Sequence, residues 1–197
     1  MIQDGLFPAT AMPDRNWWYA LWPDPDGVVR ALQIERGMTV VDLGCGDGYF
    51  TVAIARMVNP GRVIGFDLDP AMLKQAQAAC AGMMNCDWLL GDAMELSRLV
   101  GSPADYVLIA NTFHGVPDKT ALAREVATAL KPNGRFAIVN WHPLPREETT
   151  VLGEARGPRT ELRMSPEQTC AVVQPVGFKL ETLVEVPPYH YGAIFVR

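Results

Sequence analysis

Residues 40–50, VVDLGCGDGYF, decide the fold, because an apolar run passes directly into three closely spaced glycines. Such a run predicts a buried strand, and the glycines predict a tight turn in which the backbone approaches a ligand closely. A dinucleotide-binding turn has the spacing G-x-G-x-x-G, whereas Gly44, Gly46 and Gly48 give G-x-G-x-G. The turn alone therefore leaves open which ligand it holds.

Composition narrows the class of protein. A chain of 197 residues, 49% hydrophobic and 20% charged, predicts one domain with one core. The excess of 22 acidic over 17 basic residues argues against a broad phosphate-binding surface, so we expect no nucleic-acid partner. The sequence shows neither a secretory leader nor an apolar run of about 18 residues, so we expect a cytoplasmic protein without membrane contact. The cysteines are scattered and predict reduced thiols: Cys45, Cys80, Cys86 and Cys170.

Apolar runs and helix-like stretches alternate along the chain, as in a mostly parallel sheet built from βαβ units. Strands are expected at 38–44, 61–68, 86–92, 104–111, 135–141, 178–186 and 191–197, with helices at 48–59, 69–82, 119–134 and 165–177. The last two strands read as a hairpin. Residues 143–164 contain three prolines, two glycines and four arginines, which predicts a loop or a lid.

Two further acids follow predicted strands. Asp67 ends the second strand about 20 residues after the glycines, where a carboxylate accepts ribose hydroxyls of either NAD or S-adenosylmethionine (SAM). Asp92 follows the third strand, where a carboxylate can accept the exocyclic amine of adenine while the N–H of Ala93 lies near the ring. Both acids fit an adenosine moiety, which the two cofactors share.

The ordered segments VVDLGCGDG, VIGFDLDPAML, GDAMEL and ALKPNGRFAIVNW resemble those of the class I SAM-dependent methyltransferases. The resemblance covers residues 30–197, and the ending GF…PPYHYGAIFVR is most similar to the small-molecule and quinone-biosynthesis group. It implies an α/β fold with one Rossmann-like, doubly wound sheet of about seven strands, mostly parallel with an antiparallel last strand. Residues 1–197 would form one domain, with 1–30 as an N-terminal cap segment and 143–164 as a lid or substrate loop.

The same resemblance implies SAM as the cofactor. Asp42 supports this choice, since its carboxylate would attract the ammonium group of SAM and repel the pyrophosphate of a dinucleotide. We expect Cys45 to be a small buried side chain rather than a nucleophile. The expected cofactor-binding residues are Tyr19, Asp42, Gly44, Cys45, Gly46, Gly48, Asp67, Leu68, Met72, Asp92, Ala93 and Asn111.

Several acceptor classes fit the sequence poorly. Residues 111–114 read Asn-Thr-Phe-His, where enzymes that methylate DNA amino groups resemble one another in an N-P-P-Y/F signature. Cytosine-C5 enzymes need a cysteine after the fourth strand, and catechol-type enzymes need acids where this chain has Asn111 and Asn140. We therefore expect no metal and a small-molecule acceptor methylated on oxygen, nitrogen or acidic carbon. A regulatory SAM-binding protein, or a protein or metalloid substrate, are the alternatives, and the chain is expected to be a monomer or a homodimer.

All three histidines of the chain fall at the carboxyl edge of the predicted sheet, where ligands bind. His114, His142 and His190, with Tyr189, are therefore the candidate catalytic residues. Histidine titrates near neutral pH and is suited to accept a proton from a hydroxyl or an amine, which predicts a neutral limb in the pH profile. The alternative for each histidine is a hydrogen bond that ends a strand.

Two segments offer further ligand contacts. The stretch NWWYALW, residues 16–22, is either an amphipathic helix packed on the sheet or a cover whose aromatic face, through Tyr19 or Trp18, meets the sulfonium cation. The arginines of residues 143–164 are either solvated or an anion clamp for a carboxylated or phosphorylated substrate. Arg159 and Arg163 are the two candidates for such a clamp.

Overall fold

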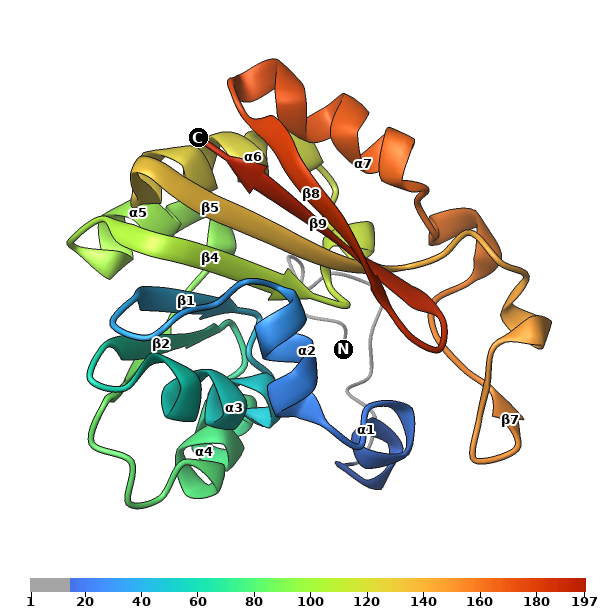
Figure 1. The fold of residues 1–197 in the computed structure, drawn as a ribbon, viewed down its shortest axis with the longest axis horizontal. Helices are drawn as coiled ribbons and strands as arrows, with labels where there is room; N and C mark the ends of the chain where they lie inside the picture. Colours follow the sequence, from blue (N-terminus) through green and yellow to red (C-terminus); the bar gives the residue numbers. More distant parts are fainter. Residues whose placement is uncertain (1–14) are drawn as a thin grey trace.

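The computed structural model describes residues 15–197, which form a seven-stranded sheet with helices on both faces (Figure 1). The strands are β1 (Thr39–Leu43), β2 (Arg62–Asp67), β3 (Cys86–Leu90), β4 (Ala104–Ala110), β5 (Leu130–Trp141), β8 (Lys179–Val186) and β9 (His190–Val196). Their order is β3-β2-β1-β4-β5-β9-β8, and β9 runs antiparallel to both neighbours. The predicted doubly wound sheet with an antiparallel last strand is confirmed.

Alternation of side chains along the strands builds one core on each face of the sheet. The helices are α1 (Arg15–Leu21), α2 (Pro25–Ala31), α3 (Tyr49–Val58), α4 (Pro70–Ala79), α5 (Leu96–Val100), α6 (Lys119–Ala129) and α7 (Pro166–Val173). Val40 packs into the core formed with α1, α2 and α3, whereas Val41 packs into the opposite core with α5, α6 and α7. Within residues 15–197, none of the helices has the length and apolarity needed to cross a membrane.

The strand order reverses at β1, which pairs with β2 on one side and with β4 on the other. The chain leaves β1 toward β2 through α3 and reaches β4 only after β3. The connections that follow β1 and β4 therefore diverge to opposite faces and leave a crevice at the carboxyl ends of these strands. In open α/β sheets, ligands bind at this position.

Helix α6 ends earlier than the sequence predicts. It was expected to reach residue 134, but it stops at Ala129, and β5 starts at Leu130. Pro132 explains the difference, because it disfavours a helical backbone at Lys131 and has no N–H to donate. The extra strand residues shift the β4–β5 register between Ala104 and Tyr106 and place Asn133 at φ 62°.

Residues 143–164 contain a small two-stranded sheet that the sequence did not predict. It consists of β6 (Thr150–Val151) and β7 (Glu154–Ala155), flanked by the 3-10 turns η3 (Arg146–Glu148) and η4 (Thr160–Leu162). Val151 is buried, and α1 contacts β6. Figure 1 shows α1 and the β7 hairpin beyond the tip of the β4 arrow. The predicted cap segment at 1–30 is described from residue 15 onward, and its first part lies outside the described residues.

Candidate functional site

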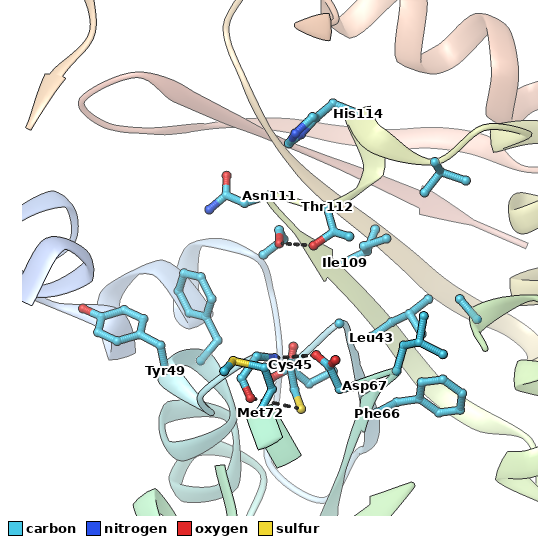
Figure 2. Close-up of a pocket in the computed structure, with 18 of the residues that line it drawn as sticks. Leu43, Cys45, Tyr49, Phe66, Asp67, Met72, Ile109, Asn111, Thr112 and His114 are labelled. Atoms are coloured by element: carbon cyan, nitrogen blue, oxygen red, sulfur yellow. Dashed lines mark hydrogen bonds between the residues drawn. The ribbon is translucent and has the colours of Figure 1, made fainter. Parts of the chain in front are cut away.

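A cavity of about 610 Å³ opens at the carboxyl ends of β1, β2 and β4 (Figure 2). Its volume lies within the range of about 300–1,000 Å³ that is typical of small-molecule sites. The predicted cofactor residues that line it are Asp42, Gly44, Cys45, Gly46, Asp67, Leu68, Met72, Asp92, Ala93 and Asn111. The structure therefore brings together side chains from four separate loops that the sequence motifs had singled out.

The glycine turn is held against β2 by its own amide groups. Gly44 N and Cys45 N both donate to the carbonyl oxygen of Phe66, at 2.7 and 3.1 Å. Gly48 has φ 83°, and a Cβ there would lie 2.8 Å from the Cα of Ala76 in α4. Only glycine tolerates both conditions, so Gly48 serves the close approach of α3 to α4. It does not line the cavity, and its expected place among the cofactor-binding residues stays a prediction.

The carboxylate of Asp67 links the glycine turn to the start of α4. One oxygen accepts a hydrogen bond from Gly46 N at 2.8 Å, and the other accepts one from Asp69 N at 2.9 Å. A carboxylate offers about four lone-pair positions, so each oxygen retains acceptor capacity toward the cavity. The Asp67 side chain is thereby held rigidly at the cavity wall.

Asp42 is a buried acid in the same wall. Its side chain is 3% exposed, and Thr51 Oγ1 donates to its Oδ2 at 2.6 Å. Burial raises the pKa of Asp42 to about 7, the Thr51 hydrogen bond opposes this, and the nearby carboxylates of Asp67 and Asp47 add to it. A carboxylate with this pKa is poised to gain from a cationic ligand.

Two polar side chains on the β4 side of the cavity are buried without partners. Asn111 follows β4 with φ 59°, and neither atom of its amide has a hydrogen-bond partner among residues 15–197. His114, in the turn η2 (Phe113–Gly115), is 4% exposed, and both ring nitrogens are likewise unpartnered within the described residues. Figure 2 draws both on the β4 side of the pocket, with Cys45, Asp67 and Met72 on the β1–β2 side. Buried polar groups of this kind need a partner, and in a cavity wall a bound ligand can supply it.

The histidine ring of His114 is neutral at pH 7. Burial, together with the positive charges of Lys119 and Arg163, lowers its pKa to about 4. A neutral ring offers one nitrogen that accepts and one that donates a hydrogen bond.

The other candidate catalytic residues lie outside the cavity wall. His190 is buried between Trp22 and Trp141, with ring centroids 4.6 and 4.1 Å away. His142 pairs with Glu185 at 3.0 Å, and its ring lies 5.3 Å from that of Tyr191. Tyr189 stacks on Trp141 and bonds through its hydroxyl to Thr150. His142 N donates to the carbonyl oxygen of Tyr189, next to His190, and burial together with the nearby charges of His142, Arg163 and His114 lowers the pKa of His190. Of the three histidines, His114 lines the cavity, and a catalytic role for the others stays a prediction.

Aromatic side chains close one side of the cavity. Trp17 and Trp18 from α1, Tyr49 and Phe50 from α3, and Trp141 from β5 line it. Tyr19, which was expected to contact the cofactor, is 52% exposed and is absent from the lining. The hydroxyl of Tyr49 donates to the carbonyl oxygen of Trp22, which ties α1 to α3.

The arginines of residues 143–164 that line the cavity are not the two that the sequence analysis selected. Arg163 is 5% exposed, donates to the carbonyl oxygens of Leu144, Pro158 and Arg156, and lies 4.9 Å over the Trp141 ring. Arg159 is exposed beside Glu161. Neither lines the cavity; Arg146 and Arg156 do. The sequence showed four arginines in this loop, but only the hairpin geometry selects these two.

Comparison with known proteins identifies the family. The model of a methyltransferase domain family matches residues 34–172. The chain belongs to this methyltransferase family. The demethylmenaquinone methyltransferases of Staphylococcus carnosus (strain TM300) and Staphylococcus aureus (strain JH9) are 33% and 34% identical to it over 108 residues. These alignments cover 54% of this chain and 44% of each relative, so the match spans less than half the length of the curated relatives.

Solved structures share the fold of the methyltransferase. A SAM-dependent methyltransferase from Aquifex aeolicus superposes with a TM-score of 0.78 at 24% identity and covers 93% of both chains. The pyocyanin biosynthetic protein PhzM superposes with a TM-score of 0.71 at 20% identity, over 88% of this chain and 54% of that one. At this level of identity the likeness shows a common fold.

We expect SAM as the cofactor, as the sequence motifs imply, and the residues that line the cavity suit that molecule. Asp67 retains acceptor positions for ribose hydroxyls, and Asp92, which lines the cavity while accepting from Met94 N at 2.9 Å, has capacity for an adenine amine. Asp42 and the unpartnered amide of Asn111 suit the polar amino acid end of SAM. A Cβ at Gly44 would lie 3.3 Å from Thr112 Oγ1, so glycine keeps this part of the wall open.

The raised pKa of Asp42 predicts that SAM binds more weakly at low pH. Only the ionised carboxylate attracts the ammonium group, and with a pKa of about 7 its ionised fraction falls roughly tenfold between pH 8 and pH 6. We expect the Kd for SAM to rise about tenfold over this interval, as measured by isothermal titration calorimetry. In Asp42→Asn the binding of SAM should be weak and independent of pH. In Thr51→Val the pH midpoint of SAM binding should move upward, because the Thr51 hydrogen bond lowers the pKa of Asp42.

Titration of Asp42 does not weaken SAM binding at low pH by unfolding the protein. Because the folded pKa of Asp42 is raised above its unfolded value of about 4, the folded state binds more protons between about pH 4 and pH 7. This group therefore makes the free protein more stable, not less, as the pH falls through 7. A Kd for SAM that stays constant from pH 8 to pH 6 in a folded protein would contradict the assignment.

Proposed function

We propose that this methyltransferase transfers the methyl group of SAM to an oxygen, nitrogen or acidic carbon of a small molecule. The observation that carries the proposal is the composition of the cavity wall beyond the glycine turn. His114 and Asn111 present buried polar atoms without partners, and the wall opposite them is aromatic. A flat acceptor with one acidic group suits this combination of stacking surface and isolated hydrogen-bonding groups.

SAM supplies an electrophilic methyl group, which is transferred by in-line displacement. The chain contributes the positioning of both reactants and the exclusion of water. Asp42, Asp67 and Asp92 orient the cofactor, and the aromatic cover formed by Trp17, Trp18 and Tyr49 keeps water from the reacting atoms. His114, neutral at pH 7, accepts the hydrogen bond or the proton of the acceptor. The names of the curated relatives, which act on demethylmenaquinone, support a small-molecule acceptor.

The proposal is tested with SAM that carries a tritiated methyl group and a cell extract divided by ultrafiltration. We expect label to enter acid-stable products of the low-molecular-weight filtrate, with formation of S-adenosylhomocysteine (SAH) in equal amount. Label confined to the retained macromolecules would instead indicate a protein substrate. Tight SAM binding without any transfer would indicate a regulatory SAM-binding protein. Asp67→Ala, which is expected to lose cofactor binding, is the negative control.

A further inference from the structure

The charged groups of the cavity wall are separated by sign. The acids of the lining lie at or just beyond the carboxyl ends of β1, β2 and β3: Asp42, Asp67, Asp69 and Asp92. The cations of the lining, Arg146 and Arg156, both come from residues 143–164, which follow β5. The acidic end matches the cationic cofactor. The basic end has no counterpart in SAM bound at the acidic end, and so requires another explanation.

Neither of these two arginines is neutralised by a close ion pair. Arg146 makes no ion pair within residues 15–197; its Nε donates to the carbonyl oxygen of Gly157 at 3.1 Å, and its two terminal nitrogens have no hydrogen-bond partner there. Arg156 has one weak ion pair, with Glu154 at 3.5 Å, and its Nε is buried without a partner among the described residues. A buried guanidinium N–H without an acceptor is unfavourable unless a ligand provides one.

The backbone holds the two arginines in place before any ligand arrives. Arg156 N donates to Thr149 O at 2.8 Å, and Arg156 O accepts from Thr149 Oγ1 and from Arg163 Nη2 at 2.9 and 3.0 Å. Arg146 N donates to Thr160 Oγ1 at 3.0 Å. Gly157 is pressed on the Trp141 ring, where a Cβ would come within 2.8 Å. Arg163 thus stabilises residues 143–164 through its hydrogen bonds, and its own positive charge is buried in the same region.

We propose that Arg146 and Arg156 form a subsite for an anionic oxygen-bearing group on the methyl acceptor, a carboxylate or a phosphate ester. Guanidinium groups recognise such anions through paired N–H donors. The inference rests on the proposed function and adds the substrate class: the acceptor is a small acid whose methylated atom lies toward His114 and whose charge lies toward the hairpin of β6 and β7.

The test uses simple probes with the SAH-loaded protein, so that no turnover is needed. The Kd values of 4-hydroxybenzoate, phenyl phosphate and the neutral isostere 4-hydroxybenzamide are measured by calorimetry. We expect at least one of the two anions to bind about tenfold more tightly than the amide, a modest factor because the Arg156 side chain is 40% exposed. In Arg146→Gln and Arg156→Gln the preference should fall toward unity, while the Kd for SAH stays unchanged.

Arg159→Gln is the matched control, because this arginine belongs to the same loop but is exposed beside Glu161. It should retain the full preference for the anion. Equal affinity for anions and amide in the unaltered protein, or a preference that survives both Gln variants, would overturn the subsite. A preference for phenyl phosphate over 4-hydroxybenzoate would assign a phosphate ester, and the reverse a carboxylate. Methylation of neutral acceptors without an anion preference would leave the proposed function standing and remove only the subsite.

Discussion

Alanine in place of Asp67 is expected to weaken the binding of SAM by about 10- to 150-fold. The carboxylate has free acceptor positions for two ribose hydroxyls, and hydrogen bonds to a charged group contribute about 1.5–3 kcal/mol. The loss also frees Gly46 N and Asp69 N, which Asp67 now holds at 2.8 and 2.9 Å. Isothermal titration calorimetry with SAM and with SAH measures the effect directly.

Two variants separate the ligand contact from the support of the turn. Asp67→Asn keeps one side-chain oxygen for a backbone amide but lacks the charge, so we expect an intermediate Kd. Asp87→Ala removes an acid of β3 that pairs with Arg62 at 2.7 Å outside the cavity, and it should bind SAM normally. An unchanged Kd in Asp67→Ala, or NADH binding more tightly than SAM to the unaltered protein, would refute the assigned cofactor site.

Replacing His114 with alanine is expected to lower kcat by about 100-fold and to leave the Kd for SAM nearly unchanged. This is the lower end of the contribution of a general base, about 3 kcal/mol. The ring is buried at the cavity wall with two unpartnered nitrogens within the described residues, so an acceptor hydroxyl is its natural partner. Measurement requires an acceptor found by the tritium assay, with kcat and KM determined separately.

A glutamine at position 114 distinguishes the two roles that this histidine can have. Glutamine retains hydrogen-bonding groups but cannot take up a proton, so partial activity indicates orientation of the acceptor and full loss indicates proton transfer. His142→Gln is the control, since His142 pairs with Glu185 outside the cavity. Full kcat in His114→Ala would mean that positioning by the rest of the cavity is sufficient.

The pH profile separates His114 from Asp42. The sequence led us to expect a histidine limb near neutral pH, but burial and two nearby cations place the pKa of His114 at about 4. The limb near pH 7 is instead expected from Asp42, through cofactor binding. It should therefore appear at subsaturating SAM and fade when SAM is saturating.

The sheet and the acids at one end of the cavity were predictable because each is encoded by a short, continuous pattern of residues. A buried strand followed by glycines and an acid at the end of the next strand each fix a ligand-facing position by spacing alone. Asp42, Asp67 and Asp92 accordingly line the cavity as expected. The α6 boundary was predictable in principle, because Pro132 marks the end of a helix, but the run of helix formers before it concealed the signal.

The acceptor end could not be predicted, because it depends on which way each side chain points. His190 and Tyr191 are neighbours in β9, yet one packs under Trp22 and Trp141 and the other beside His142. The rotation of α1 about its own axis likewise determines that Trp17 and Trp18 line the cavity while Tyr19 is exposed. For Arg146 and Arg156, the deciding contact is with a distant tryptophan through Gly157, which no local pattern encodes.

The tryptophans of the cavity wall have an optical consequence. Trp17, Trp18 and Trp141 line the cavity, and they are three of the five tryptophans of the chain. The surroundings of these indoles change when a ligand displaces water from the pocket, so we expect the intrinsic fluorescence to change with occupancy. The protein carries its own reporter for occupancy, and the emission of unlabelled samples can follow cofactor and acceptor binding at concentrations too low for calorimetry.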